Sequence, residues 1–275
     1  MVERLKAAIE KARERRGAGG ATSPEGGALA PVRGPNRSSW AALPEQALDG
    51  PRLRRGRIGN FERNPRINQP FDVLRTRLLK ICAANGWRRI GVTSPTKGCG
   101  KTMLCANLAF SLARYAETYA LVVDLELRAP HLGRTLGLSA DASIVDMLNG
   151  AADHKSALVR VGDRLAFGLN DKPVPDASER LQSAETQTAL SRMVAALAPT
   201  IVIYDLAPML QGDETIGFLD NLDGVIVVAA AGATTAEQIE ECDRLLGDAA
   251  PLIGLVLNKC EDDGPEGYQY DYAAA

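Results

Sequence analysis

The sequence Thr93-Ser94-Pro95-Thr96-Lys97-Gly98-Cys99-Gly100-Lys101-Thr102 lies between an apolar run of strand length, 89–93, and a segment with helical spacing, 103–109. The two glycines allow the backbone to curl so that successive N–H groups point at phosphate oxygens. A helix that begins near Lys101 adds its positive N-terminal end to the same site. Lys101 can reach the β- and γ-phosphates, and the Thr102 hydroxyl can ligate Mg²⁺. The stretch therefore predicts a nucleotide-binding loop, a variant P-loop in which Pro95 replaces the first Gly of G-x-x-x-x-G-K-[ST].

The segments on either side of this loop alternate between helical and extended patterns. Residues 71–79 have helical spacing, and further apolar runs of strand length occur at 120–123, 201–204, 224–229 and 253–257. Continuous Val/Ile/Leu runs separated by amphipathic stretches are typical of strands that helices bury on both faces. The predicted fold is an α/β, doubly wound, mainly parallel sheet of the P-loop NTPase type.

Two of the predicted strands end in a carboxylate. Asp124 follows the run 120–123, and Asp205 follows the run 201–204. Because doubly wound sheets bind ligands at the carboxyl ends of their strands, both side chains are expected beside the loop. Carboxylates next to a bound triphosphate suit Mg²⁺, which prefers oxygen ligands.

Composition limits the class of protein. Hydrophobic residues make up 45% and charged residues 24%, and the net charge is −2, which argues against a nucleic-acid partner. No apolar run is long enough to span a membrane. Five scattered cysteines predict reduced thiols and a cytoplasmic location rather than a disulfide framework.

The chain divides into three predicted regions. Residues 1–60 are basic, with twelve Lys/Arg and six Asp/Glu, and their Gly/Pro content predicts a mostly disordered arm that begins with a short helix at 3–16. Residues 61–260 form the predicted ATPase or kinase domain. Residues 261–275 form a predicted flexible tail.

The order of these motifs resembles the bacterial tyrosine kinases of capsule and exopolysaccharide synthesis. The resemblance rests on the loop 93–102, on Asp124-x-Glu126-x-Arg128-x-Pro130, on Asp205 and on Asn258-Lys259. These kinases are P-loop ATPases related to Min-type and Par-type proteins, and their folds are unlike those of eukaryotic kinases.

The resemblance implies ATP and Mg²⁺ as cofactors and assigns roles by position. It implies catalytic roles for Lys101, Asp124, Glu126 and Asp205, with Asp124 also placed to accept or orient the tyrosine hydroxyl proton. It implies metal ligation by Thr102, Asp124 and Asp205. The implied nucleotide-binding residues are Thr96, Lys97, Gly98, Cys99, Gly100, Lys101, Thr102, Met103, Arg128 and Asn258, with Asn258 on the adenine.

The family usually ends in a tyrosine cluster that is autophosphorylated. Tyr268, Tyr270 and Tyr272 stand near the end of this sequence and would be the phosphorylation sites. The resemblance further implies a homo-oligomer and a separate membrane chain-length regulator that activates the kinase and recruits it to the inner face of the cell membrane.

Several positions depart from the family pattern. Glu126 replaces the usual Asp, Lys97 adds a cation to the loop, and only Arg75 remains of a helical Glu-x-x-Arg-x-x-Arg subunit contact. Two alternatives therefore stay open beside the kinase. One is a Min/Par-like ATPase switch, whose signature lysine would fall at Thr96, and the other is a nucleotide-binding scaffold of the polysaccharide machinery.

Overall fold

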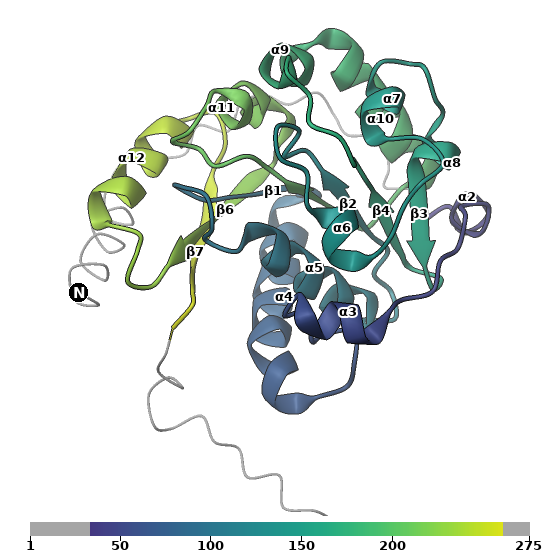
Figure 1. Cartoon of the computed structure of the whole chain (residues 1–275), viewed down its shortest axis with the longest axis horizontal. Coiled ribbons are helices and arrows are strands. Elements are labelled where there is room, and N and C mark those ends of the chain that lie inside the picture. Colours follow the sequence, from purple (N-terminus) through teal and green to yellow (C-terminus); the bar gives the residue numbers. More distant parts are fainter. Residues whose placement is uncertain (1–33, 261–275) are drawn as a thin grey trace, which may run out of the picture.

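The computed structural model describes residues 34–260. A seven-stranded sheet forms its centre, with the strand order β3-β4-β2-β5-β1-β6-β7 (Figure 1). All neighbouring strands are parallel except β3 and β4, which are antiparallel. The strands are β1 (Arg89–Thr93), β2 (Ala120–Asp124), β3 (Leu158–Val161), β4 (Leu165–Gly168), β5 (Ile201–Asp205), β6 (Gly224–Ala230) and β7 (Leu252–Asn258).

Helices cover both faces of this sheet. The helices are α2 (Arg37–Ala41), α3 (Gly50–Arg55), α4 (Pro65–Asn85), α5 (Lys101–Ala113), α6 (Leu132–Leu136), α7 (Ile144–Leu148), α8 (His154–Ala157), α9 (Ala177–Gln182), α10 (Ala184–Leu197), α11 (Glu214–Phe218) and α12 (Ala236–Leu246), with a 3₁₀ turn η1 (Leu219–Asn221). Side chains of α3, α4, α5 and α6 share one core cluster, and those of α2, α7, α9, α10 and α12 share the other. The doubly wound, mainly parallel α/β prediction is confirmed.

The strands are apolar throughout because both of their faces are buried. In β2, Ala120 and Val122 pack into the cluster with α5, whereas Leu121 and Val123 pack into the cluster with α10. Every residue of β2, β5 and β6 is buried. Continuous apolar runs are the pattern expected for a two-sided parallel sheet.

The predicted boundary at residue 60 differs from the structure. Residues 34–60 form α2 and α3 and pack along the domain, with Trp40, Leu53 and Ile58 fully buried. The Gly/Pro content of this region indicated disorder, but such a composition is an average over many residues. Burial of three large apolar side chains is enough to hold the segment against the domain. We call residues 34–60 the strap. The predicted helix at 3–16 and the tail at 261–275 lie outside the described residues.

The strap is held by hydrogen bonds as well as by packing. The Trp40 indole donates to the carbonyl of Leu197 at 2.9 Å, at the end of α10. At the other end of the strap, the Asn107 side chain of α5 accepts from the backbone N–H groups of Gly59 and Asn60, at 3.0 and 3.1 Å. The strap therefore joins the edge of the sheet to the helix that follows the nucleotide-binding loop.

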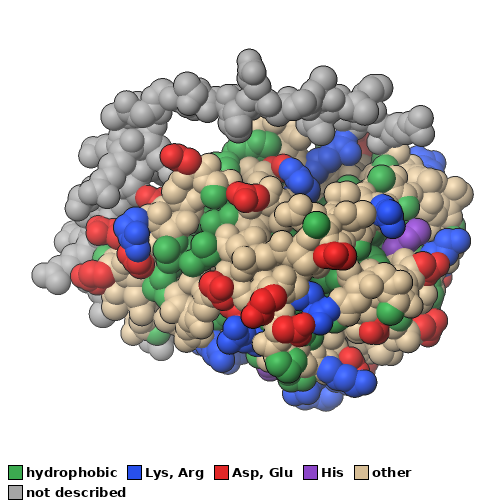
Figure 2. Space-filling model, turned by 90° about the horizontal axis from the view of Figure 1, so that it is seen from above, with side chains coloured by type: hydrophobic (Ala, Val, Ile, Leu, Met, Phe, Trp, Pro, Cys, Tyr) green, Lys and Arg blue, Asp and Glu red, His purple; other side chains and the backbone are tan. Residues whose placement is uncertain are grey.

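The surface is charged and mixed. Acidic and basic side chains lie interspersed over the face shown in Figure 2, in keeping with the net charge of −2. Within residues 34–260, no helix has the length and apolar character needed to cross a bilayer.

Candidate functional site

The nucleotide-binding loop lies where the sequence predicted it, between β1 and α5. Gly98 and Gly100 have φ angles of 81° and 97°, a backbone region that side chains other than glycine rarely adopt. A Cβ on Gly100 would also lie 2.2 Å from the Asn258 amide nitrogen. Only glycine fits at position 100, for both reasons.

The loop is fastened to the end of the sheet. The Asn258 amide donates to the carbonyl of Cys99 at 2.8 Å, and the Thr93 hydroxyl donates to the carbonyl of Ala207 at 2.7 Å. Asn258, expected beside the adenine from the resemblance, thus holds the loop backbone in the described state. The end of β7 and the segment that follows β5 therefore support the curl of the nucleotide-binding loop.

Cys99 is buried within the loop. Its sulfur lies 3.8 Å from the Thr96 hydroxyl and 3.7 Å from the Thr234 hydroxyl. Burial acts to raise the pKa of the Cys99 thiol, but hydrogen bonds from Thr234 and Thr96 outweigh it and lower the pKa below its usual value. The thiol therefore serves as a packed link between the loop and the start of α12.

Lys101 is the first residue of α5, and its side chain is almost fully buried. Its ammonium lies 3.3 Å from a carboxylate oxygen of Glu126. A buried ammonium requires a charged partner, because burial of an unpaired charge costs several kcal/mol. Glu126 supplies that partner from the loop that follows β2.

Asp124 and Asp205 are paired residues at the carboxyl ends of the neighbouring strands β2 and β5. The Asp124 carboxylate accepts backbone N–H groups from Glu126 at 3.2 Å and from Leu132 at 3.0 Å, so it shapes the loop that carries Glu126. The Asp205 carboxylate is buried, and neither of its oxygens has a hydrogen bond of standard geometry. The sequence prediction that both acids meet beside the loop agrees with this arrangement.

The pKa values of both carboxyl groups are raised, mainly by burial. Burial raises the pKa of Asp205 to about 6, although the Lys101 ammonium and the Thr102 hydroxyl close by act to lower it. Burial and the charge of Asp205 raise the pKa of Asp124 well above its usual value. A pair of buried carboxylates with raised pKa values is the electrostatic setting that a bound cation relieves.

These residues fit a magnesium ion. The unsatisfied Asp205 carboxylate and the Thr102 hydroxyl supply the hard oxygen ligands that Mg²⁺ prefers, and it typically takes few protein ligands and keeps several waters. Asp124 adjoins them on the next strand.

Arg128 and Glu214 form an ion pair that the sequence analysis missed. Glu214, the first residue of α11, is buried, while Arg128 is half-exposed. The two residues belong to the loops that follow β2 and β5, so their contact ties together the loops that begin at Asp124 and Asp205. Their separation of 86 positions left no local pattern in the sequence.

The remaining predicted site residues occupy different surroundings. Lys97 and Gly98 are exposed at the tip of the loop, whereas Thr96, Thr102 and Met103 are half-buried. Tyr268, Tyr270 and Tyr272 lie outside the described residues. Arg75 donates to Asp72 at 3.0 Å and to the carbonyl of Ser111 at 3.1 Å, and its role in a subunit contact stays a prediction.

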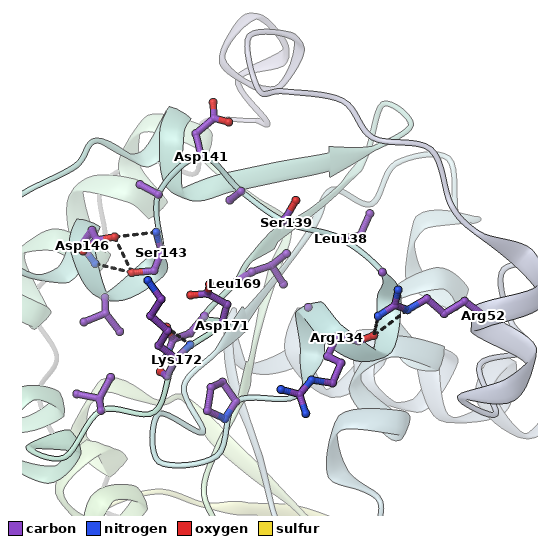
Figure 3. A pocket seen from close by; sticks show the side chains of 18 residues that line it. Arg52, Arg134, Leu138, Ser139, Asp141, Ser143, Asp146, Leu169, Asp171 and Lys172 are labelled. Atoms are coloured by element: carbon purple, nitrogen blue, oxygen red, sulfur yellow. Dashed lines mark hydrogen bonds between the residues drawn. The ribbon is translucent and has the colours of Figure 1, made fainter.

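A polar cleft of about 620 Å³ adjoins the site on the β4 side (Figure 3). Its wall is joined to the site loop, because the Val174 N–H donates to the carbonyl of Leu127 at 2.9 Å. Basic Arg134 and Lys172 and acidic Asp141 and Asp171 line the cleft. Charges of both signs give it no preference for an anion, so the glycine-rich loop is the candidate phosphate site.

The chain resembles known proteins at low sequence identity. No family model matches it. Among curated proteins, it is 23% identical over 210 residues to the tyrosine-protein kinase YwqD of Bacillus subtilis, covering 76% of this chain and 88% of that one. It is 27% identical over 177 residues to the tyrosine-protein kinase CpsD of Streptococcus pneumoniae, covering 62% and 76%.

Solved structures show the same fold. The kinase domain of the Escherichia coli tyrosine kinase ETK superposes with a TM-score of 0.66 at 22% identity, covering 75% of this chain and 80% of that one. The chimerical protein CapA2B2 gives 0.66 at 20% identity, covering 73% and 87%. A cobyrinic acid a,c-diamide synthase from Mycobacterium smegmatis with bound ATP analogue and magnesium gives 0.50 at 24% identity, covering 62% and 74%. The resemblance to the bacterial tyrosine kinases and the P-loop ATPase fold are confirmed.

Proposed function

From the similarity to the bacterial tyrosine kinases, we propose that this chain is an ATP-dependent protein-tyrosine kinase that phosphorylates its own tail. In this proposal the kinase regulates the polymerisation and export of an exopolysaccharide or capsule. The observation that carries the proposal is the unsatisfied Asp205 carboxylate, buried beside Lys101 and Thr102 at the end of the nucleotide-binding loop. Similarity to proteins named tyrosine kinases favours this function over the ATPase switch.

In this proposal the loop residues bind ATP. The curled backbone around Gly98 and Gly100 holds the phosphates, and Lys101 exchanges its contact with Glu126 for a contact with phosphate oxygens. Asp205 and Thr102 would hold Mg²⁺, with Asp124 beside them. When bound there, the ion would supply positive charge that offsets the charge of the phosphates.

The chemistry is a phosphoryl transfer to a tyrosine hydroxyl. The phenolic oxygen bonds to the γ-phosphorus, the bond from that phosphorus to the bridging oxygen breaks, and ADP leaves with that electron pair. The phenolic proton passes to the carboxylate of Asp124, which stands beside Asp205 at the carboxyl end of its strand. The ion pair between Arg128 and Glu214 keeps the loops of Asp124 and Asp205 in place.

The acceptors in this proposal are Tyr268, Tyr270 and Tyr272 of another copy in a homo-oligomer. A separate membrane chain-length regulator activates the kinase and recruits it to the inner face of the membrane. A structural neighbour, the chimerical CapA2B2, supports pairing of such a kinase with a second protein.

Label transfer from γ-³²P-ATP in the presence of Mg²⁺, with and without a candidate activator segment, tests the proposal. Label is expected on the wild type, and it should be lost in Lys101→Met and in the triple Tyr268/Tyr270/Tyr272→Phe variant. Matched controls are Lys155→Met, an exposed lysine on α8, and Tyr115→Phe, an exposed tyrosine after α5. ATP hydrolysis without protein label would establish the ATPase switch, and nucleotide binding with neither activity would establish the scaffold.

A further inference from the structure

The two edge strands of the sheet, β3 and β7, differ in how far the described chain covers them. The strap covers the outer edge of β3, because the Arg160 N–H donates to the carbonyl of Pro44 at 2.8 Å and the Gln46 N–H donates to the carbonyl of Arg160 at 3.0 Å. Glu45 thereby forms a parallel bridge with Arg160. An edge covered by its own chain cannot pair with a foreign strand.

The other edge, β7, lacks such a cover within residues 34–260 (Figure 1). Every residue of β7 is partly exposed, whereas every residue of its neighbour β6 is buried. Leu257 is 37% exposed, one of the few large apolar side chains at the surface of the described chain. The strand is seven residues long and contains no proline or charged residue, the devices that usually protect an edge.

The backbone of β7 presents pairing groups at this edge. The carbonyl of Asn258 accepts from the Ala231 N–H and so faces β6. Because backbone groups alternate in direction along a strand, those of Val256 also face β6, and those of Leu255 and Leu257 face outward. The thiol of Cys260, a weak donor, lies 3.7 Å from the carbonyl of Leu257.

The chain that follows β7 contains a segment suited to this edge. Tyr268-Gln269-Tyr270-Asp271-Tyr272 alternates aromatic and polar residues with a period of two, the pattern of a strand with one buried face. Tyrosine also has a high propensity for strands. Nine residues, 259–267, lie between β7 and this segment and include Asp263-Gly264-Pro265, residue types that favour a turn.

We propose that residues 268–272 pair antiparallel with the outer edge of β7 as a further strand, with the three tyrosine rings on the face of Leu255 and Leu257. The pairing satisfies the outward backbone groups of Leu255 and Leu257 and covers the exposed Leu257 side chain. Aromatic rings beside aliphatic side chains are favourable cross-strand neighbours. The tail of the same chain thereby covers the second edge of the sheet, as the strap covers the first.

Phosphorylation would release this strand, a consequence that rests on the proposed function. Each phosphate adds about −1.5 to −2 charges at pH 7, and repulsion between phosphates on neighbouring tyrosines would oppose docking. Phosphates on this face would also lie against Leu255, which packs into a core cluster, so burying their charge there would cost free energy.

Amide hydrogen exchange of the unphosphorylated full chain, followed residue by residue by NMR, tests the docking without any need for kinase activity. The tyrosines that stand opposite Leu255 and Leu257 carry the backbone N–H groups that face β7, so Tyr270→Pro removes a donor from the proposed pairing, and Tyr270→Phe controls for the loss of the hydroxyl. We expect the Leu255 and Leu257 amides to exchange at least about tenfold faster in Tyr270→Pro than in Tyr270→Phe, while Val256 is unchanged because it faces β6. Ala274→Pro, outside the proposed strand, is the matched control and should match the wild type.

Equal exchange of Leu255 and Leu257 in Tyr270→Phe and Tyr270→Pro would overturn the proposal. Protection that appears only as protein concentration rises would also overturn it, in favour of a second copy's tail on this edge. Replacement of the three tyrosines by Glu should raise exchange at Leu255 and Leu257, and unchanged protection there would overturn release by charge. A kinase that proved inactive would leave the result with Tyr270→Pro intact, so the two proposals fail separately.

Discussion

The ammonium of Lys101 lies 3.3 Å from the carboxylate of Glu126, with only 5% and 12% of the two side chains exposed. The charge of the Lys101 ammonium is therefore neutralised by the Glu126 carboxylate. The bacterial tyrosine kinases usually have the shorter Asp at the position of Glu126. A phosphate that binds in the loop must compete with Glu126 for Lys101. We therefore expect the ion pair between Lys101 and Glu126 to weaken nucleotide binding.

Glu126→Gln is expected to tighten the binding of Mg²⁺-free ADP by about three- to tenfold, a change of about 1 kcal/mol. The amide keeps the shape of the side chain, while the negative charge that competes with phosphate for Lys101 is removed. Isothermal titration calorimetry measures the change, with Glu179→Gln, an exposed acid on α9, as the control. Weaker binding of ADP in Glu126→Gln would show that Glu126 positions Lys101 rather than restrains it.

The raised pKa of Asp205 gives metal-free protein a characteristic dependence of stability on pH. Burial moves this pKa from 3.8 to about 6, so the native state holds more protons on Asp205 than the unfolded state between these values. The free energy of unfolding therefore falls as pH rises from about 4 to about 6. The expected loss is at most about 3 kcal/mol.

Urea denaturation in EDTA at several pH values, for wild type and Asp205→Asn, isolates this effect from the other titrating groups. The variant should equal the wild type near pH 4 and be more stable near pH 7.5. Addition of Mg²⁺ with ADP should stabilise the wild type more than Asp205→Asn, because the variant lacks the carboxylate proposed to hold the ion. A wild type that is more stable than Asp205→Asn at pH 7.5 without ligand would contradict the assignment.

The ion pair between Arg128 and Glu214 is expected to affect the rate of phosphoryl transfer by holding the loops that begin at Asp124 and Asp205 in place. Glu214→Gln removes the buried charge that holds Arg128, so the rate of tail phosphorylation should fall about tenfold while the Kd for ADP changes less than twofold. Quenched time-course assays with γ-³²P-ATP measure the rate of tail phosphorylation, and calorimetry measures the Kd for ADP. An equal loss in both would mean that Glu214 supports the nucleotide-binding loop itself.

The strap is expected to contribute to the stability of the domain. Trp40 is 1% exposed, and its indole contacts the ring of Tyr119 at a centroid distance of 5.1 Å. Trp40→Ala should therefore lower the free energy of unfolding by about 3–5 kcal/mol. Arg37→Ala, an exposed position on the same helix, should change it by less than about 0.5 kcal/mol. Similar unfolding midpoints for the two variants would show that the strap is not part of the cooperative unit.

The sequence predicted the parts of the fold that repeat a strong local pattern. The strands β1, β2, β5, β6 and β7 were recognised because buried parallel strands are uninterrupted apolar runs. The strands β3 and β4 were missed because Leu158–Val161 and Leu165–Gly168 have only four residues each, too few to establish a period. Their antiparallel pairing is decided by contact with each other and with β2.

The site was predictable to the same extent. Asp124 and Asp205 could be brought together from the sequence because parallel strands place their carboxyl ends at one edge. Glu214 could not, since its partner Arg128 is distant along the chain and their contact depends on how two loops fold. The strap was missed because its anchors, such as Trp40 and Leu53, are few among glycines and prolines.

The strap and β7 place the two ends of the described chain at opposite ends of the strands. The described chain enters at Asn36, whose N–H donates to the carbonyl of Leu197 at the edge where strands begin. It leaves after Asn258, beside the nucleotide-binding loop, at the edge where strands end. The two ends of residues 34–260 therefore lie at opposite ends of the strands, and the C-terminal one adjoins the nucleotide-binding loop.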